Sequence, residues 1–440
     1  MRIAYFPHCY NLGEVTTGIQ IGKALVRRGH EVTFLSHGGS YESLIESEGF
    51  RIYRVYPLIT PQEHSQFIRA NRGEGFFNRI FSLKKIIQLV RGELKIYQDL
   101  KPDAVVSANV TASLSSRIEN IPFIIPIAGT WTLPFWEYGL GTYKLDGGLP
   151  FVNFLPDRIS NFLAYRFHRL KEKIMLENFN RAAKYFGLPE FKNTFEIMTG
   201  NLNLITDIPE ILGVPEEYMC RYRTYRENLS SIAPLWRYVG PIFAKVDIEI
   251  PDGVKEVFSF SGPKIFCSMG SSTNLKFLKE ALNVLLSGDY YSVVIIPPQM
   301  QSKIRVSFEG RENLIVCSFL PSHRVSPMAD VALIHGGRGT VYTACAAGIP
   351  IVGVDMQPEQ RLNLECIERA GVGIRLSKRE FRRGNIISSV EKVLKDQKFR
   401  ENAKRISRLF KFHKGEENAA RIIEDLIKRR INCKIRRNEV

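Results

Sequence analysis

Short apolar runs alternate along the chain with stretches in which apolar residues recur at helical spacing. Near the N-terminus, apolar runs at residues 3–6 and 31–36 flank a helical pattern at residues 18–28, and residues 7–17 are expected to form a loop. A strand, a glycine-containing loop, a helix and a second strand predict a βαβ unit with a parallel sheet. The alternation resumes in the second half, with apolar runs at residues 265–268, 292–296, 314–318 and 331–334. We therefore predict an α/β protein with two Rossmann-like domains, each built on a parallel sheet.

A connector at residues 243–262 separates the two alternating halves. It is rich in turn-forming Pro, Gly and Asp and has little periodicity. At 440 residues the chain is also too long for one hydrophobic core. We expect domains at residues 1–242 and 263–412, and a C-terminal helix with a basic tail at residues 413–440 that packs back toward the first domain. Ligand is expected in a cleft between two facing domains, at the carboxyl ends of their strands.

The glycine-rich stretch after the apolar run at residues 331–334 is the strongest candidate for a binding site. Glycines follow His335 at a tight turn, where the backbone can approach a ligand closely. Residues 338–347 then suit a helix that Gly348 ends. The free N–H groups and the dipole of a helix N-terminus favour an anion, and His335 adds a side-chain donor. The residues alone indicate either a phosphate or diphosphate site or an ordinary strand-to-helix turn.

The composition is that of a soluble globular protein, with 44% apolar and 24% charged residues. The chain contains no run of about 18 uncharged apolar residues, so a transmembrane helix is not expected. Residues 1–6 suit a first strand and lack the regions of a signal peptide. The seven cysteines are scattered and form no Cys-x-x-Cys or Cys/His cluster, so we expect neither a disulfide framework nor a metal site. A reducing cytoplasm is the simplest compartment.

The formal net charge of +16, from 61 basic and 45 acidic residues, favours anionic partners. The basic cluster at residues 378–383 is explained by a solvated face. The basic cluster at the C-terminus is either a solvated tail or a contact with an anionic membrane surface. Nucleic acid is not expected as a partner, because no aromatic platform or known binding motif accompanies the charge. The first cluster contains Lys378, Arg379, Arg382 and Arg383, and the second contains Lys428, Arg429, Arg430, Lys434, Arg436 and Arg437.

Two further stretches each allow a structural and a functional interpretation. Residues 76–97 place apolar side chains at helical spacing among basic ones. This pattern suits a surface helix of an α/β domain or an interfacial helix that meets a membrane or a lipid-bearing acceptor. Residues 129–156 gather aromatic side chains among glycines and prolines. Such a loop either packs on its own aromatics or lines a site for a sugar or an apolar acceptor.

The stretch from His335 to Leu376 resembles the signature of the family 1 nucleotide-sugar glycosyltransferases. That family has the GT-B architecture of two facing Rossmann-like domains. Together with shorter matches, the resemblance covers most of the chain, and residues 129–197 are the least similar. The shorter matches lie at residues 27–34, 101–103, 239–241 and 268–271.

The resemblance implies that the C-terminal domain holds the diphosphate of a nucleotide sugar. His335 would contact it together with the N–H groups at the start of the following helix, and hydroxyls in the loop after residues 265–268 would add contacts. Such a site needs no metal or cofactor, because the helix dipole and His335 neutralise the departing diphosphate. The implied diphosphate ligands are His335, Gly337, Arg338, Gly339, Thr340, Ser271 and Thr273.

The rest of the nucleotide sugar is assigned by the same resemblance. Phe319, followed by Leu320, matches the position at which related enzymes stack an aromatic on the nucleobase. Glu359 and Gln360 correspond to an acid–Gln pair that hydrogen-bonds the hydroxyls of the donor sugar, and Asn363 supports that pair or the phosphates.

Two positions depart from the common family pattern. Many relatives bind the ribose hydroxyls with a Glu where this chain has Thr343. Many also have Gly-His-Val in the first loop, with the His as general base, where residues 13–15 are Gly-Glu-Val, closer to the antibiotic and sterol branch. Glu14 is therefore the candidate base, or else a carboxylate that binds acceptor or caps the next helix. His8 in the same loop is the reserve base or a structural histidine.

The sequence thus predicts a cytoplasmic glycosyltransferase that moves a hexose or amino-hexose from a UDP-sugar to an acceptor hydroxyl, with inversion and without a metal. The N-terminal domain would bind the acceptor. A lipid-linked acceptor and a peripheral position at the inner face of the membrane would fit the basic surface. Two alternatives use the same fold. One is a UDP-N-acetylglucosamine 2-epimerase, which needs no acceptor, and the other is an accessory subunit that binds the donor without turnover.

Overall fold

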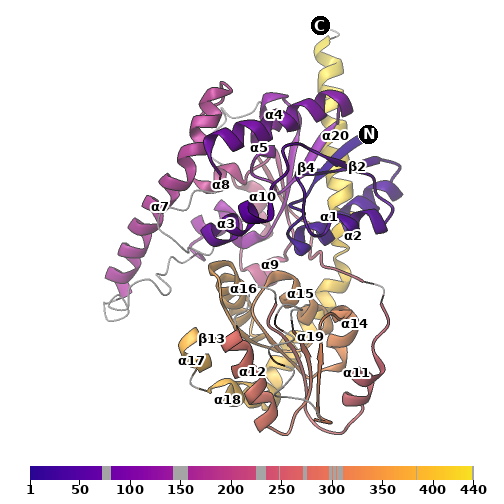
Figure 1. The fold of residues 1–440 in the computed structure, drawn as a ribbon, viewed down its shortest axis with the longest axis vertical. Coiled ribbons are helices and arrows are strands. Elements are labelled where there is room, and N and C mark those ends of the chain that lie inside the picture. Colours follow the sequence, from indigo (N-terminus) through magenta and orange to yellow (C-terminus); the bar gives the residue numbers. More distant parts are fainter. Residues whose placement is uncertain are drawn as a thin grey trace. The chain divides into compact units, whose positions relative to one another are not determined.

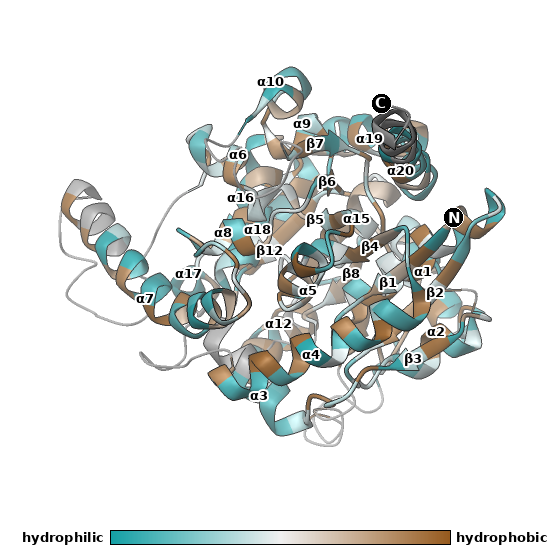
Figure 2. Ribbon diagram, turned by 90° about the horizontal axis from the view of Figure 1, so that it is seen from above, coloured by the Kyte–Doolittle hydropathy of each residue, from teal (hydrophilic) through white to brown (hydrophobic). Residues whose placement is uncertain are grey.

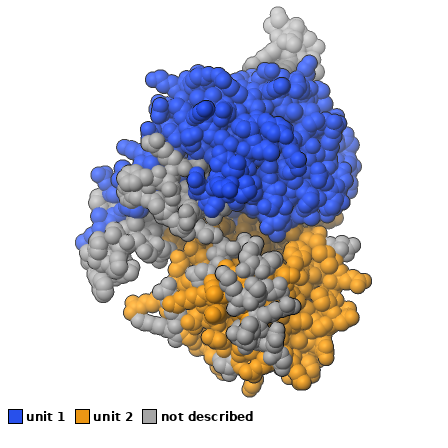
Figure 3. Space-filling model, in the orientation of Figure 1, with its two compact units in different colours: residues 1–207, 214–242, 415–440 blue, residues 208–213, 243–414 orange. Residues whose placement is uncertain are grey.

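The chain folds into two compact units, coloured separately in Figure 3. Unit 1 comprises residues 1–207, 214–242 and 415–440, and unit 2 comprises residues 208–213 and 243–414. Each unit contains a parallel sheet covered by helices (Figure 1), so the predicted α/β class with two parallel sheets is confirmed. The computed structural model describes residues 1–71, 81–141, 157–223, 234–246, 248–270, 275–296, 300, 304, 311–382 and 384–438.

The sheet of unit 1 has seven parallel strands in the order β3-β2-β1-β4-β5-β6-β7. From β1 the chain builds the sheet toward one edge, and from β4 it builds toward the other. The strand order therefore reverses between β1 and β4, where residues 3–6 pair with residues 104–107. The strands are β1 (Arg2–Phe6), β2 (Glu31–Ser36), β3 (Ile52–Arg54), β4 (Ala104–Ser107), β5 (Phe123–Ile127), β6 (Leu202–Ile205) and β7 (Leu235–Tyr238).

Helices cover both faces of this sheet, as buried parallel strands require. They are α1 (Leu12–Arg27), α2 (Glu42–Ser47), α3 (Pro61–Asn71), α4 (Leu83–Leu100), α5 (Ala112–Ile118), η1 (Gly129–Trp131), α6 (Leu133–Glu137), α7 (Asp157–Tyr185), α8 (Thr194–Ile197), α10 (Glu216–Arg221) and α20 (Gly415–Asn438).

Helix α1 begins at Leu12, so the predicted loop at residues 7–17 is wrong from residue 12 onward. Asn11 caps the helix, and its Oδ1 accepts from the N–H groups of Gly13 and Glu14. Residues 15–18 are buried, and a Cβ at Gly18 would lie only 2.7 Å from the ring of Tyr5. The weak helix propensity of Gly and Thr concealed this first turn, and close packing on β1 overrides it.

The C-terminal helix α20 packs along α1 within unit 1 (Figure 1). Arg28 Nε donates to Glu424 Oε2 at 2.7 Å, which ties the end of α1 to α20. A Cβ at Gly415 would lie 2.5 Å from the carbonyl oxygen of Pro241, so the first residue of α20 sits directly on the chain after β7. The apolar residues of α20 in the common core are Ala419, Ala420, Ile423, Leu426 and Ile427.

Part of the basic C-terminal cluster is engaged by unit 1 itself. Lys428 pairs with Glu424 one turn earlier on α20. Arg430 Nη2 donates to Asn120 Oδ1 at 2.9 Å. These two cations therefore have protein partners.

Helix α4 occupies the stretch that the sequence assigned either to a surface helix or to an interfacial one. It carries both hydrophobic and hydrophilic residues (Figure 2). Its apolar side is packed in a core cluster shared with α7, where Ile86, Leu89 and Val90 are fully buried. This side is therefore not open to a membrane, and the pattern is that of a surface helix. Phe77 and Ile80 lie outside the described residues.

The aromatic stretch after β5 is described up to residue 141. Within it, Phe135 is fully buried, and Trp136 Nε1 donates to Thr130 O at 3.0 Å. Trp131 and Tyr138 remain 45% and 41% exposed. The described part thus packs partly on itself and leaves two aromatics at the surface, whereas residues 142–156 lie outside the described residues.

A buried polar network joins α4 to the end of β2. Glu93 is fully buried, and its Oε1 lies 2.9 Å from His37 Nε2. The hydroxyls of Thr111 and Ser115 donate to the same carboxylate, each at 2.5 Å. His37 Nδ1 lies 2.8 Å from the carbonyl oxygen of Val55. Because every polar group here has a partner, the network stabilises one arrangement of the carboxyl-end loops of unit 1.

The sheet of unit 2 has six parallel strands in the order β10-β9-β8-β11-β12-β13. They are β8 (Lys264–Ser268), β9 (Tyr291–Ile295), β10 (Leu314–Cys317), β11 (Val331–Ile334), β12 (Ile351–Val354) and β13 (Gly373–Leu376). The order reverses between β8 and β11. Helices of this unit are α9 (Pro209–Leu212), α11 (Asp252–Val257), α12 (Leu275–Ser287), α14 (Ser322–Val325), η5 (Ser326–Met328), α15 (Arg338–Ala347), α16 (Pro358–Arg369), α17 (Lys378–Arg382), α18 (Ile386–Lys395) and α19 (Gln397–Phe412).

In the part of the chain that is described, no helix combines the length and the apolar character that crossing a membrane requires. The free cysteines are Cys9, Cys220, Cys267, Cys317, Cys345 and Cys366.

Candidate functional site

The glycine-rich turn of unit 2 lies where the strand order of its sheet reverses. Ser268 at the end of β8 pairs with Ile334 at the end of β11. The carboxyl ends of β8 and β11 are therefore adjacent, and the chain continues from these two strands toward opposite edges of the sheet. Open α/β sheets bind ligands at such a switch point. Residues 335–337 connect β11 to α15 there.

The imidazole of His335 is the central side chain of this site. It is 8% exposed, and its Nδ1 lies 3.2 Å from the carbonyl oxygen of Ser268. Because a carbonyl oxygen can only accept, Nδ1 carries the proton and Nε2 of the neutral ring has the lone pair. Burial lowers the pKa of His335, and the hydrogen bond to Ser268 opposes part of this effect. At neutral pH the ring is therefore uncharged.

Glycines surround this ring because no side chain would fit beside it. A Cβ at Gly270 or at Gly337 would lie 2.4 Å from His335 Nε2. Gly336 has a φ of +77°, and a Cβ there would also lie 2.8 Å from the carbonyl oxygen of Gln360. The sequence explained the glycines after His335 by the tight turn alone. The structure shows that Gly337, and Gly270 in the loop after β8, also leave the space that the imidazole occupies.

Helix α15 begins directly after this turn, with Gly337 at the N-cap and no side-chain cap. Its first intrahelical bond runs from Val341 N to Gly337 O at 3.0 Å. The N–H groups of Gly339 and Thr340 precede this bond and lie at the positive end of the helix dipole. The arrangement can hold an anion beside His335.

The residues expected to bind the sugar stand together on the first two turns of α16. Asn363 Nδ2 donates to Glu359 Oε1 at 2.7 Å and to Gly336 O at 3.0 Å. Gln360 Oε1 accepts from Met356 N at 2.9 Å. Asn363 thus links the acidic side chain to the glycine turn, which places α16 next to the start of α15. The predicted grouping of these three residues near His335 is what the structure contains.

The remaining predicted donor residues are less closely grouped. Phe319, in the segment after β10, is 52% exposed, whereas Leu320 is 4% exposed and contributes to the core. An aromatic ring in this position presents a face for stacking. Ser271 and Thr273 lie outside the described residues.

Thr343 stands where many relatives have a Glu, and its hydroxyl points toward the backbone of its own helix. Its Oγ1 donates to Gly339 O at 2.8 Å, and the side chain is 7% exposed. A Thr hydroxyl that bonds the helix backbone in this way is a local structural contact.

In unit 1, Glu14 lies in the first turn of α1. Its Oε2 accepts from His8 N at 3.1 Å, and its Oε1 accepts from Asn11 Nδ2 at 3.2 Å. With Asn11 at the N-cap and Glu14 three residues later, the pair has the spacing of a capping box.

His8 belongs to a cluster of rings that the sequence did not reveal. Its ring centroid lies 5.2 Å from that of His64 on α3, and His64 stacks on Tyr10 at 4.3 Å. Burial, together with a smaller contribution from His64, lowers the pKa of His8 to about 4. The imidazole of His8 is therefore neutral at physiological pH and is a weak base. His64 carries no sequence signal because it reaches the β1 loop only through the packing of α3.

Two further polar residues near the strand ends were missed. Ser107 at the end of β4 donates from Oγ to Phe6 O at 2.6 Å, so it joins β4 to β1 at the switch point of unit 1. Asp355 after β12 lies 2.8 Å from Arg375 Nε. The only signal for each is a polar residue directly after a buried strand. Among the described residues, no group of three or more His, Cys, Asp and Glu side chains is placed to hold a metal ion.

The close approach of Gly337 to His335 can be tested with two neighbouring glycines. Gly337→Ala should lower the free energy of unfolding of the protein by about 1–3 kcal/mol, because its Cβ collides with the imidazole. Gly339→Ala, for which no atom lies within 4 Å of the new Cβ, should leave stability unchanged or raise it by up to about 1 kcal/mol. Denaturant unfolding of both variants measures the difference.

Gly337 has a φ of −62°, so backbone strain does not complicate this comparison. Equal stabilities of the two alanine variants would contradict the packing of His335 between the glycines.

Comparisons with known proteins agree with this architecture. Residues 285–423 match the family described as erythromycin biosynthesis protein CIII-like, C-terminal domain. Over 359 residues, the chain is 26% identical to a PGL/p-HBAD biosynthesis glycosyltransferase of Mycobacterium tuberculosis, and this match covers 81% of the chain and 77% of the relative. It is 23% identical to the 4'-demethylrebeccamycin synthase of Lentzea aerocolonigenes, with 94% and 97% covered.

Solved structures share the fold over nearly the whole length. The spinosyn rhamnosyltransferase SpnG superimposes with a TM-score of 0.67 at 15% identity, covering 96% of this chain and 100% of that one. The calicheamicin glycosyltransferase CalG4 gives a TM-score of 0.66 at 17% identity, with 98% and 99% covered. SpnG has also been solved in complex with thymidine diphosphate and with spinosyn aglycone.

Proposed function

We propose that this chain is a glycosyltransferase of the family 1 type with the GT-B fold, and that it transfers a hexose or amino-hexose from a UDP-sugar to an acceptor hydroxyl. The C-terminal domain, residues 263–412, binds the donor, and the N-terminal domain, residues 1–242, binds the acceptor. The observation that carries the proposal is the convergence of His335, the glycine turn and the N-terminus of α15 at the switch point of unit 2.

The donor is held at three places along the nucleotide sugar. The N–H groups of Arg338 to Thr340 and His335 bind the diphosphate, with hydroxyls of Ser271 and Thr273 in support. Glu359 and Gln360 bind the sugar hydroxyls. The exposed ring of Phe319 stacks on the base.

The reaction proposed is a single displacement with inversion that uses no bound metal. The departing diphosphate gains negative charge as the glycosidic bond to the donor breaks. The N-terminus of α15 and the imidazole of His335 stabilise that charge, because both are already oriented before the reaction.

The geometry of His335 couples donor binding to the uptake of a proton. In the neutral ring, the hydrogen bond to Ser268 occupies Nδ1–H and leaves a lone pair on Nε2. A phosphate oxygen next to this lone pair would be repelled. Diphosphate binding therefore favours the imidazolium, in which Nδ1–H stays on Ser268 and Nε2–H donates to the phosphate.

The test of the overall proposal is nucleotide release from a panel of sugar donors. With UDP-hexoses and UDP-amino-hexoses, release should require both the enzyme and an acceptor from a membrane-lipid extract. TDP-sugars belong in the panel because SpnG has been solved with thymidine diphosphate. Formation of an epimer without acceptor would instead indicate an epimerase, and the absence of release from every donor would contradict the transferase.

The coupling at His335 predicts a pH dependence of UDP binding. Free His335 has a pKa below its usual value and is neutral at pH 7, so binding takes up a proton and affinity should fall as the pH rises. His335→Gln should weaken UDP binding by about 10- to 100-fold, as expected for a lost charged hydrogen bond. It should also remove the proton uptake. Calorimetry in buffers of different ionisation enthalpy measures both.

His413→Gln is the matched control, because it changes another histidine of unit 2 at the end of α19. Proton uptake that persists in His335→Gln would assign the coupling to another group.

We assign Glu14 as the base that takes the proton from the acceptor hydroxyl. Its two observed hydrogen bonds hold the carboxylate in a defined orientation at the end of β1. His8, with its pKa lowered to about 4, is a weak base.

Replacing Glu14 by Gln keeps the size of the side chain and its capacity to accept from His8 N, but removes its basicity. We expect kcat to fall by about 10²- to 10⁴-fold with UDP affinity and thermal stability unchanged. His8→Gln should change kcat only a few-fold. The opposite order of effects would make His8 the base, and full activity of Glu14→Gln would leave Glu14 with the capping role alone.

We further propose a lipid-linked acceptor and a peripheral location at the inner face of the membrane. The net charge of +16 supports attraction to anionic lipid. The relatives named for PGL/p-HBAD biosynthesis make glycolipid-type acceptors the first class to include in the panel.

A further inference from the structure

Helix α7 carries a row of exposed apolar side chains along its N-terminal half. Ile159, Leu163, Phe167 and Leu170 follow one another at spacings of four, four and three residues, so they lie on one face of the helix. Their exposed fractions are 49%, 38%, 37% and 49%. We call these four residues the apolar stripe. On the opposite side, further along α7, the buried residues Leu176, Phe179 and Ala183 pack in the core of unit 1.

The charges that accompany the apolar stripe are basic. Arg166 and Lys173 are exposed on the same part of α7. Of the acidic residues of α7, Glu172 is 4% exposed and pairs with Arg169 at 2.6 Å, whereas Glu177 is exposed about two turns after Leu170. The surface around the stripe therefore combines apolar contact area with positive charge, which is the composition of helices that lie at membrane interfaces.

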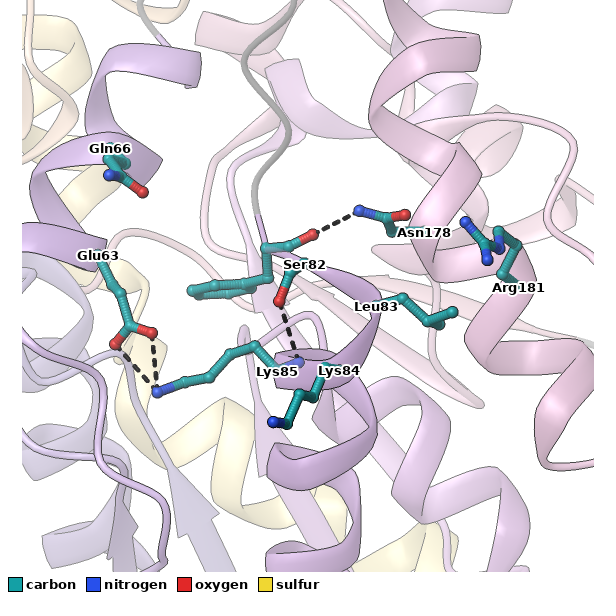
Figure 4. Close-up of a pocket in the computed structure, with 9 residues that line it drawn as sticks. Glu63, Gln66, Ser82, Leu83, Lys84, Lys85, Asn178 and Arg181 are labelled. Carbon is teal, nitrogen blue, oxygen red and sulfur yellow. Dashed lines mark hydrogen bonds and ion pairs between the residues drawn. The ribbon is translucent and has the colours of Figure 1, made fainter.

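A pocket of about 520 Å³ adjoins the C-terminal half of the same helix (Figure 4). Arg181 lines it and lies 11 residues, or about three helical turns, after Leu170, so it faces the same side as the stripe. Figure 4 shows Lys84 and Lys85 across from it. The pocket is lined by Glu63, Gln66, Phe81, Ser82, Leu83, Lys84, Lys85, Asn178 and Arg181.

The lining of this pocket has a positive net charge. Glu63 is its acidic member and is bound by Lys85, with Nζ 2.9 Å from Oε1. Lys85 Nζ also donates to Leu58 O at 2.8 Å, so it is held in place. Lys84 and Arg181 add two cations for which the lining contains no second carboxylate. An anionic group is therefore the ligand that the pocket favours.

We propose that the apolar stripe and this basic pocket together dock unit 1 on an anionic phospholipid bilayer. The stripe enters the boundary between head groups and acyl chains, and the pocket takes the phosphate of a lipid head group. Arg181 places one wall of the pocket on the side of α7 that carries the stripe, so a single flat surface can engage both features at the same time. The inference rests on the proposed function, because transfer to a lipid-linked acceptor is the reason for docking. The binding to the bilayer itself requires no sugar transfer.

The test uses the whole protein and sedimentation with vesicles. Vesicles of phosphatidylcholine with one-third phosphatidylglycerol should bind the protein at least tenfold better than phosphatidylcholine alone, and salt should weaken this binding. Leu163→Ser with Phe167→Ser should lower the binding at least tenfold. Lys84→Glu with Arg181→Glu should remove the preference for phosphatidylglycerol. Lys84 and Arg181 are exposed, and more than a third of Leu163 and of Phe167 faces solvent, so folding should persist and is checked by thermal unfolding.

Two matched double variants serve as controls. Val26→Ser with Phe412→Ser removes two other exposed apolar residues, and Lys404→Glu with Arg405→Glu reverses two other exposed charges. Both should bind vesicles within twofold of the unchanged protein. Equal losses of vesicle binding in the controls would show that the effect is not specific to the stripe and the pocket, and would overturn the proposal.

Other outcomes separate the competing explanations. Failure of the unchanged protein to bind either vesicle, or a stripe variant that alters only self-association, would mean that another protein chain covers α7. Competition by soluble glycerol phosphate at millimolar concentration would make the pocket a site for free phosphate esters, also against the proposal. Loss of sugar transfer with vesicle binding retained would count against the proposed function and leave the docking surface intact.

Discussion

The hydrogen bond between His335 Nδ1 and the carbonyl oxygen of Ser268 is the constraint on which the candidate donor site depends. It joins the ends of β8 and β11, the two strands from which the chain builds the sheet of unit 2 in opposite directions. The bond orients the ring and determines which nitrogen carries the proton. Glycine is then required at 270 and 337, because the ring occupies the space that a Cβ would need. The same turn starts α15 without a side-chain cap, which leaves N–H groups for an anion.

Unit 1 repeats this arrangement with different residues. Its strand order reverses between β1 and β4, where Ser107 Oγ bonds the carbonyl oxygen of Phe6. The segment after β1 leads to His8 and then to Glu14 in the first turn of α1. In both units, therefore, a polar side chain at one strand end bonds a backbone carbonyl of its neighbour, and the candidate functional residues follow directly. The buried Glu93 network holds the adjacent end of β2 in place.

In unit 1, packing decides which charged and apolar side chains remain exposed, and the amino-acid composition does not. Lys428 and Arg430 of the basic C-terminal cluster are bound by Glu424 and Asn120. The apolar side of α4 lies in the core. The N-terminal half of α7, by contrast, leaves its apolar stripe in solvent. The surface that we propose for a lipid bilayer is thus on the helix after the aromatic stretch, and not on the helix whose sequence pattern suggested it.

By itself, the sequence determined the α/β class, the glycine turn after β11 and the presence of Glu359, Gln360 and Asn363 on one helix, whereas their place beside the turn was implied only by the family resemblance. These features follow from local periodicity, from residues that only a turn tolerates and from spacing within one helix, all of which act between near neighbours. Only the tertiary structure decided the partner of His335, the ring cluster of His8 with His64, and the early start of α1. Each depends on contacts between distant segments, which outweigh local propensity. The same reason separates α4 from α7: an amphipathic pattern states that one side of a helix is apolar, and only packing decides whether that side meets the core or solvent.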